Sequence, residues 1–307
     1  MRVLVKLVLV VIGVAVIAAA GLFVMTNRML AAQVDLPATV SPVVLPATGD
    51  TIALERGRYL IDHAFNCRIC HAQDFGGRAE IDNAAIGRLW APNLTLGEGS
   101  ATRDYTPTDW ARAIRHGLDP TGRRLILMPS EDYYAFSDDD IGSVVAYIRS
   151  QPAVDRADAG ISVGPVGRFL LATGDVEFAY DKISHAAPRS AASPAASLEW
   201  GRVLGSTCVG CHGEGLSGGA IPGGDPAWPP ARNLTRHATG LGSWSQADFF
   251  TALRKGQRPD GTALAPPMPW QAYAGLTDAD TEALWLYLQS MPPKEQATGS
   301  CRYTAPV

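Results

Sequence analysis

The stretch Cys67-Arg68-Ile69-Cys70-His71 occurs a second time in the chain, as Cys208-Val209-Gly210-Cys211-His212. In each copy two cysteines stand three positions apart and a histidine follows at once. A single match could be a disulfide pair or half of a zinc site, because short motifs carry a false-positive risk. The second copy, with matching sequence downstream, argues against both alternatives and indicates one chemistry used twice.

That chemistry is the covalent attachment of c-type haem. On one helical turn two thiols reach the two vinyl groups of a single porphyrin and form thioethers, and the adjacent histidine supplies the proximal iron ligand. The motifs therefore predict two covalently attached haem c groups. The predicted attachment residues are Cys67, Cys70, Cys208 and Cys211, and the predicted proximal ligands are His71 and His212.

Further landmarks repeat after the two motifs at a steady spacing of about 140 residues, which is the pattern of an internal duplication. Asn93-Leu94-Thr95 matches Asn233-Leu234-Thr235, and Met128-Pro129 matches Met268-Pro269. The chain then divides into an anchor (1–30), an extended linker (31–50), a first domain (51–152), an interdomain linker (153–197), a second domain (198–294) and a tail (295–307). Within the second linker, 168–171 and 176–180 are apolar enough to pack on a domain surface.

Each copy is expected to consist of short helices joined by long loops, with no alternating strand pattern, so the predicted class is all-α. Helices precede both haem motifs, over 52–65 and 198–205. Capping signals mark the remaining helix ends. Middle helices begin after Thr106 and Ser245 and end at Gly117 and Gly256, and final helices run from Ser137 and Thr277 until just before Pro152 and Pro292.

The N-terminus carries an uncharged run of 19 residues, Leu7 to Met25, with Arg2 and Lys6 ahead of it. A helix of that length spans about 28 Å, close to the thickness of the hydrocarbon core of a bilayer. A cleaved signal peptide is the alternative, but the run exceeds the usual signal core. We therefore expect a retained transmembrane helix in the cytoplasmic (inner) membrane, with its N-terminus inside and the haem domains in the periplasm.

Methionine is the expected sixth ligand of each iron, because His/Met ligation gives a closed electron-transfer site. Met128 is the only methionine available to the first haem. Met268 and Met291 compete for the second, and Met268 is preferred because it occupies the repeat position of Met128. The alternative for either residue is filling a gap in the core. The rival histidines do not share repeat positions, so we expect them to be exposed or hydrogen-bonded elsewhere: His63, His116, His185 and His237.

Several other residues have two open interpretations. Asn93, Thr95 and their repeat equivalents, Asn233 and Thr235, could bind haem propionates together with Trp90 and Arg232, or could hold their own loops together. Gly57 with Tyr147, and Gly201 with Tyr287, are expected to let the first and last helices of each copy cross closely. Cys301 is left outside both motifs, as an unpaired or intermolecular thiol.

Each half resembles the class I cytochrome c fold. The pattern Asn-Leu-Thr, then Trp244 to Phe249, Gly256, Pro267-Met268-Pro269-Trp270 and Tyr287-Leu288, is similar to the cytochrome subunits of membrane-bound alcohol and sugar dehydrogenases. The resemblance implies tandem class I cytochrome c domains that receive electrons from a dehydrogenase. Well-known members of that group carry three haems, whereas this chain has motifs for two, and its N-terminal apolar segment resembles anchored dihaem cytochromes of other respiratory complexes.

These features predict a membrane-anchored electron carrier rather than an enzyme. It would relay single electrons between a dehydrogenase or respiratory complex and a terminal acceptor. The alternatives are a subunit of an oxidase or photosynthetic complex, and a dihaem peroxidase or thiosulfate-oxidising enzyme, which would need an open iron. A net charge of −4 gives no reason to expect a nucleic-acid partner.

Overall fold

The computed structural model describes residues 1–36, 40–187, 189, 192–225 and 227–299. Cys301 and part of the second linker (190–191) lie outside these ranges. The first half of the chain contains α1 (Arg2–Ala31), α2 (Thr51–Leu60), the π-helical turn η1 (Ile61–Phe65), α3 (Cys67–His71), β1 (Arg78–Asn83), β2 (Gly87–Ala91), α4 (Pro107–His116), α5 (Ser130–Tyr133) and α6 (Asp138–Arg149). The rest contains β3 (Ser162–Val163), α7 (Pro165–Thr173), the 3₁₀ turn η2 (Ala179–Lys182), α8 (Leu198–His212), α9 (Gln246–Lys255), α10 (Trp270–Tyr273) and α11 (Asp278–Ser290).

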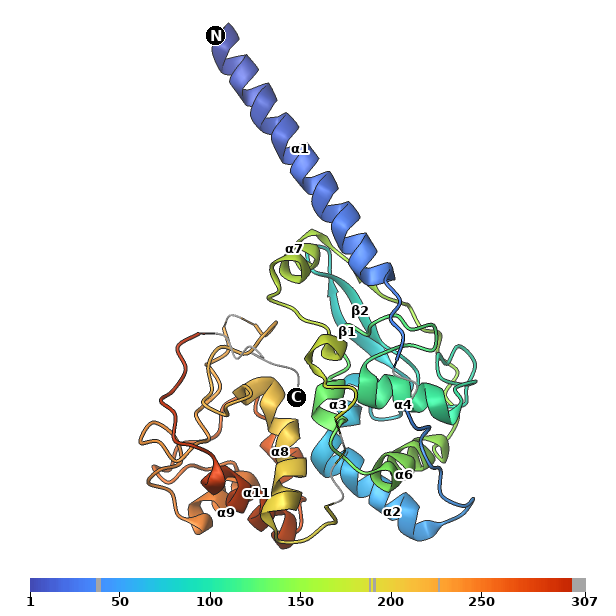
Figure 1. Ribbon diagram of the computed structural model, residues 1–307, viewed down its shortest axis with the longest axis vertical. Coiled ribbons are helices and arrows are strands. Elements are labelled where there is room, and N and C mark those ends of the chain that lie inside the picture. The colour runs from blue at the N-terminus through green and yellow to red at the C-terminus, as the bar shows by residue number, and fades with distance from the viewer. Residues whose placement is uncertain (37–39, 188, 190–191, 226, 300–307) are drawn as a thin grey trace.

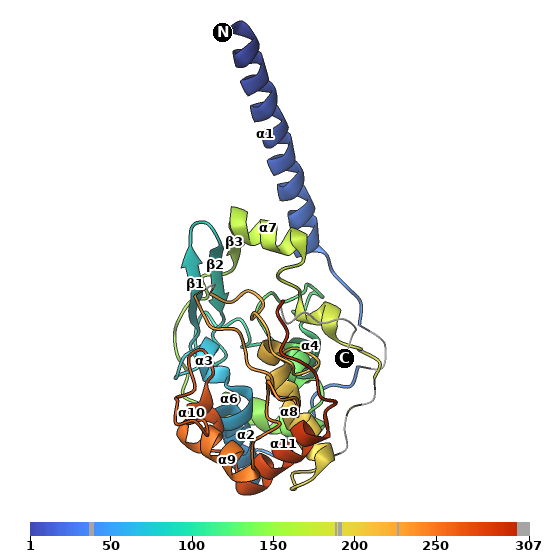
Figure 2. The ribbon, with the colours of Figure 1, turned by 90° about the vertical axis from the view of Figure 1, so that its left-hand side faces the viewer.

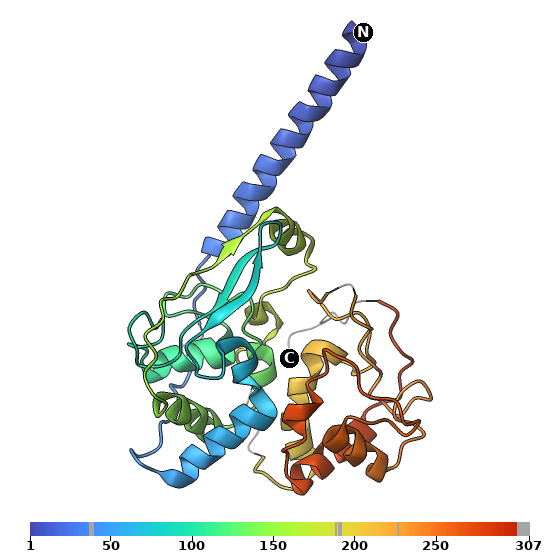
Figure 3. The same cartoon turned by 180° about the vertical axis from the view of Figure 1, so that it is seen from behind.

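The chain forms a body of two helical halves side by side, from which α1 projects (Figures 1 and 3). Within the described residues α1 is the one helix long and apolar enough to cross a membrane, and its apolar window is not buried against the body. The prediction of a mainly helical chain with an apolar N-terminal helix is confirmed.

Helix ends in the two halves follow the predicted capping signals. Thr106 and Asp109 form a capping box at the start of α4, and Ser245 and Asp248 form the same box at α9. Both helices end at a glycine in the left-handed region, Gly117 with φ 63° and Gly256 with φ 65°, a conformation that glycine adopts without strain.

In each half the first and last helices cross over a glycine. A methyl group on Gly57 would lie 2.0 Å from the carbonyl oxygen of Ser143, and one on Gly201 would lie 1.9 Å from that of Ala283. Only glycine therefore allows α2 to approach α6, and α8 to approach α11, this closely. This confirms the predicted role of both glycines.

A small antiparallel sheet is the main departure from the predicted helical pattern. β1 and β2 form a hairpin and β3 adds to β2, in the order β1-β2-β3. The expectation that the chain has no strands was wrong here. The matching segment of the second half contains Pro222, Pro229 and Pro230, and its described residues (219–225 and 227–232) form only the isolated bridge Gly219–Ala231, because proline cannot donate to a strand ladder.

The described part of the linker after α1 lies against the first half of the chain. The backbone N–H of Val34 donates to Gly122 O at 2.9 Å, and that of Val43 donates to Pro107 O at 3.1 Å. Val43 is 3% exposed. The second linker also packs on the body, since Leu171 and Phe178 are buried, as predicted for its apolar segments.

Candidate haem sites

Each motif histidine lies at the end of a helix with one ring nitrogen already in use. His71, at the end of α3, pairs its Nδ1 with Pro92 O at 2.9 Å, and His212, at the end of α8, pairs its Nδ1 with Arg232 O at 2.7 Å. A carbonyl oxygen only accepts, so Nδ1 carries the proton and donates. The lone pair is then on Nε2, the nitrogen that remains for an iron.

Burial sets the protonation of the motif residues. It lowers the pKa of His71 and His212, which keeps both imidazoles in the neutral form that binds metal. It also raises the pKa of the thiols of Cys67 and Cys208 to about 12. Cys67, Cys70 and Cys208 form no disulfide among the described residues, so these thiols are available for thioether bonds.

Two buried asparagines hold the loops that present the carbonyl acceptors. Asn93 Nδ2 donates to Val154 O at 2.7 Å, and its Oδ1 accepts from Thr95 N at 2.9 Å. Asn233 Nδ2 likewise donates to Lys294 O at 2.6 Å, and its Oδ1 accepts from Thr235 N at 2.8 Å. Of the two interpretations of the Asn-Leu-Thr repeats, this geometry favours the one in which each loop is held together by its own chain.

Trp90 has the property expected of a propionate donor. Its indole Nε1 is buried and has no hydrogen-bond partner among the described residues. A buried donor without a partner destabilises a fold by about 1–3 kcal/mol. A haem propionate beside β2 would satisfy it, so this orphaned donor and the two Nε2 lone pairs are features that fit haem c.

The two candidate methionines occupy equivalent loops. Met128 O accepts from Ser130 N at 2.9 Å, and Met268 O accepts from Trp270 N at 2.9 Å. The prolines that follow have similar backbone angles, φ −82° and ψ 62° at Pro129, and φ −85° and ψ 53° at Pro269. Both methionines are half-buried. The repeat therefore extends from sequence to local backbone geometry.

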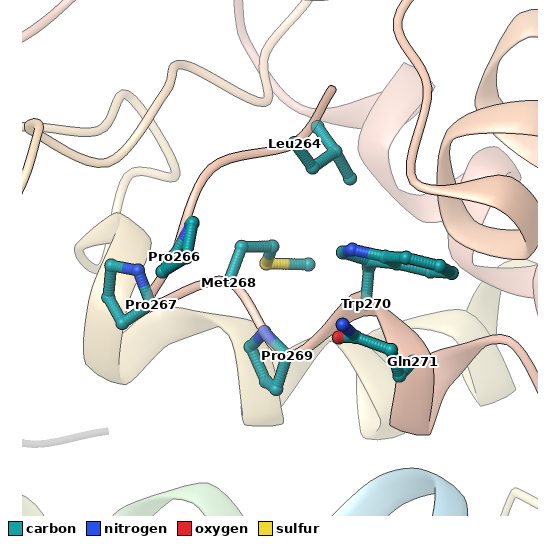
Figure 4. Close-up of a pocket in the computed structure, with 7 residues that line it drawn as sticks. All are labelled: Leu264, Pro266, Pro267, Met268, Pro269, Trp270 and Gln271. Atoms are coloured by element: carbon teal, nitrogen blue, oxygen red, sulfur yellow. The ribbon is translucent and has the colours of Figure 1, made fainter.

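A cavity of about 280 Å³ lies at Met268, and the methionine's thioether points toward Trp270 (Figure 4). Its lining is mostly apolar: Leu264, Pro266, Pro267, Met268, Pro269, Trp270 and Gln271. The rival Met291 follows the last residue of α11 and does not line this cavity.

The other histidines have partners away from the motifs. His63 Nδ1 contacts Ala272 O at 2.9 Å, and His237 Nδ1 contacts Thr239 Oγ1 at 2.9 Å. His116 and His185 face each other with 2.9 Å between their Nδ1 atoms. Burial and the neighbouring His185 lower the pKa of His116 to about 3. This pair ties the interdomain linker to α4.

Each half places the short helix after its methionine on the haem-motif segment of the other half. Ser206 Oγ on α8 donates to Asp132 O on α5 at 2.6 Å, and His63 in η1 contacts Ala272 O on α10. The aromatic rings of Phe136 and Trp200 meet edge to face with 6.0 Å between centroids. The buried apolar residues of both halves form one continuous core.

Asp132 was not identified from the sequence, although it touches the second motif. Its carboxyl group is hydrogen-bonded by the backbone amide of Gly210, which lies between Cys208 and Cys211, while its Oδ1 has no partner among the described residues. Burial raises the pKa of Asp132 well above its usual value. The repeat position in the other half is Ala272, so no repeat signal marked it.

The class of protein follows from these sites together with two family models. Residues 53–148 match the model "Cytochrome C oxidase, cbb3-type, subunit III", and residues 201–292 match the model "Cytochrome c". The two halves are cytochrome c domains, and each carries covalently attached haem c.

Curated relatives narrow the class further. The chain is 28% identical to the fructose dehydrogenase cytochrome subunit of Gluconobacter japonicus, over 82% of this chain and 55% of the relative. It is 26% identical to the cytochrome c subunit of the quinone alcohol dehydrogenase of Gluconobacter oxydans, over 86% and 60%. It is 29% identical to the gluconate 2-dehydrogenase cytochrome c subunit of Pantoea cypripedii, over 79% and 60%. The chain spans slightly more than half the length of these relatives and is homologous to dehydrogenase cytochrome subunits.

Proposed function

We propose that the protein is a membrane-anchored electron carrier that takes single electrons from a dehydrogenase and delivers them to a terminal acceptor. The observation that carries this proposal is the pairing of two equivalent haem sites across a shared core. Both sites have a neutral histidine held by a carbonyl and a methionine loop of the same backbone geometry. The cytochrome subunits of fructose, alcohol and gluconate dehydrogenases support the choice of electron donor.

We assign the iron ligands as His71 with Met128 and His212 with Met268. Haem c supplies an iron that takes up and releases one electron. Pro92 and Arg232 carbonyls fix the ring orientation of the histidines, which tunes the ligand's basicity. Met128 and Met268, bound to the two irons, would raise the potentials and leave no open position for a substrate, which favours electron transfer over peroxidase or thiosulfate chemistry.

The anchor proposal rests on α1. No residue of its uncharged run, Leu7 to Met25, is buried, and the run has the length of a bilayer core. Arg2 and Lys6 precede it, and positive charge on that side favours an N-terminus in the cytoplasm by the positive-inside rule. The haem domains then lie in the periplasm, where bacterial haem c is attached.

An oxidase or a related electron-transfer complex is the second candidate partner. The match of the first half to a cbb3-type oxidase subunit model is the observation that favours it. The haem chemistry is the same, and only the partner differs.

A redox titration of the full-length holoprotein, followed by optical spectra, tests the haem assignment. We expect two low-spin one-electron transitions and the weak red absorption band of methionine–iron ligation. A high-spin haem in the resting protein would refute the carrier function and favour an enzyme. Purification from detergent-solubilised membranes then identifies the partner, because a co-purifying dehydrogenase supports the first candidate and a co-purifying oxidase the second.

A further inference from the structure

The interdomain helix α7 is fastened to the end of α1. Arg168 Nη1 donates to Thr26 Oγ1 at 2.7 Å and to Asn27 Oδ1 at 2.8 Å. The same guanidinium lies 4.3 Å from the ring centroid of Phe23, and Thr26 is fully buried. Figure 2 shows α7 running across the foot of α1. These contacts hold α7 beside Thr26 and Asn27, near the C-terminal end of α1.

That position lies about one bilayer thickness along α1 from the start of its apolar run. The apolar run of α1 starts at Leu7, and Thr26 follows 19 residues later, a rise of about 28 Å. The hydrocarbon core of a bilayer is about 30 Å thick. If α1 spans the membrane, α7 lies where hydrocarbon gives way to headgroups, close to Arg28.

The two faces of α7 are unlike. One face packs on the β1–β2 hairpin, where Val166 N donates to Ala85 O at 2.8 Å and a methyl on Gly167 would lie 2.4 Å from Ile86 O. Leu171 is buried on the same side. The opposite face presents Val166, 44% exposed, and Phe169, 56% exposed. No described part of the chain covers this apolar face.

We propose that α7 is a membrane-surface helix whose exposed residues Val166 and Phe169 enter the headgroup boundary of the phospholipid bilayer. The inference rests on the proposed retained anchor. Lipid is the chosen occupant because α7 is joined through Arg168 to the end of the apolar run of α1, where Phe23 is 52% and Val24 is 51% exposed. Interfacial helices bury such a face about 5–10 Å into the headgroup and acyl boundary.

This second contact would give the body a defined orientation. A single helix leaves the attached domains free to tilt, whereas α1 and α7 together contact the bilayer at two places. The hairpin fixed under α7 belongs to the first half, so the first cytochrome domain is held next to the membrane. The second domain lies away from α1 (Figures 1 and 3).

Photochemical labelling in phospholipid vesicles tests the proposal on the full-length holoprotein. Phe169 is replaced by p-benzoylphenylalanine, and adducts are identified by mass spectrometry after illumination. Val16, in the middle of α1 and 62% exposed, is the positive control. Leu286, on α11 at the end of the body away from α1 (Figure 1) and 39% exposed, is the matched apolar control. We expect phospholipid adducts at positions 16 and 169, and at least tenfold fewer at 286.

The other outcomes separate the two proposals. Adducts at 16 without adducts at 169 would overturn the role of α7 and leave the anchor standing. Adducts at neither position would overturn the anchor and the inference with it. Equal labelling at 169 and 286 would show non-specific lipid contact, and cross-linking of position 169 to protein would show that a protein or α1 itself covers the face. Either result would overturn the inference.

Discussion

The crossing of α8 over α11 gives a sharp test of the packing of the second haem domain. In Gly201→Ala the new methyl would lie 1.9 Å from Ala283 O and 2.9 Å from Tyr287 Cβ. Since Cβ contacts below 3.0 Å essentially do not occur, the helices must separate by roughly 1 Å at this point. The obstacle is a backbone carbonyl, which cannot turn away as a flexible side chain can.

The expected loss of stability follows from two opposing effects. Alanine favours a helix over glycine by up to about 1 kcal/mol, whereas overpacking a core costs about 1–3 kcal/mol and occasionally more. With backbone in the way we expect the upper end, and a net loss of about 2 kcal/mol. Because both halves share one core, the unfolding unit is large, and this loss lowers Tm by about 4–8 °C.

Thermal unfolding of the holoprotein, followed by circular dichroism, measures the effect. Gly210→Ala is the matched control, because it lies in the same helix and the nearest atom to its methyl would be a side-chain oxygen of Asp132, at 3.2 Å, and not a backbone atom. Both variants should retain two covalent haems. A Gly201→Ala protein that melts at or above the wild-type temperature, or a control that loses as much stability, would refute the reasoning.

Three further predictions concern the second haem, the domain interface and a helix cap. Met268→Ala should lower the potential of one haem and abolish its red methionine–iron band with both haems still attached, whereas Met291→Ala should leave the titration unchanged; the opposite result would exchange their roles. The pKa of Asp132 is raised in the fold, so the unfolded chain releases this proton at a lower pH and the free energy of unfolding falls as the pH rises above about 4. Asp132→Asn should flatten that pH dependence in urea unfolding measured from pH 5 to 8. An unchanged pH dependence would contradict the argument that burial raises this pKa. Ser245→Ala removes the cap of α9 and should lower the free energy of unfolding by about 1 kcal/mol, measured by urea titration with wild type alongside; no loss would mean that tertiary packing alone holds the helix end.

The parts of the fold that could be predicted depend on neighbours in sequence. A capping box such as Thr106 with Asp109 joins residues three apart, and a left-handed glycine ends a helix through its own backbone. The haem motifs are equally local. The duplication supplied a further signal, because Met268 could be preferred over Met291 as the expected iron ligand only by comparison with Met128.

The parts that could not be predicted depend on contacts between distant residues or are not repeated. The β1–β2 hairpin forms in one half only, since prolines occupy the equivalent segment of the other. The acceptors of the motif histidines, Pro92 and Arg232, are backbone atoms and carry no side-chain signature, although both directly precede Asn-Leu-Thr. Asp132 has no repeat counterpart, and only the docking of α5 on α8 shows that it touches the second motif.

The core shared by the two halves has a consequence for expressing either half alone. Tandem repeats are often separable into independent modules. Here Trp200 is fully buried, and Phe136 from the other half covers part of its ring. Asp280 of the second half is contacted by Tyr59 of the first. Expressing either half alone would expose these surfaces, and the Asp280 carboxylate would keep its hydrogen bond from Trp200 but lose the one from Tyr59. We therefore expect the two copies to depend on each other for stability, and the pair to be the smallest unit that folds stably.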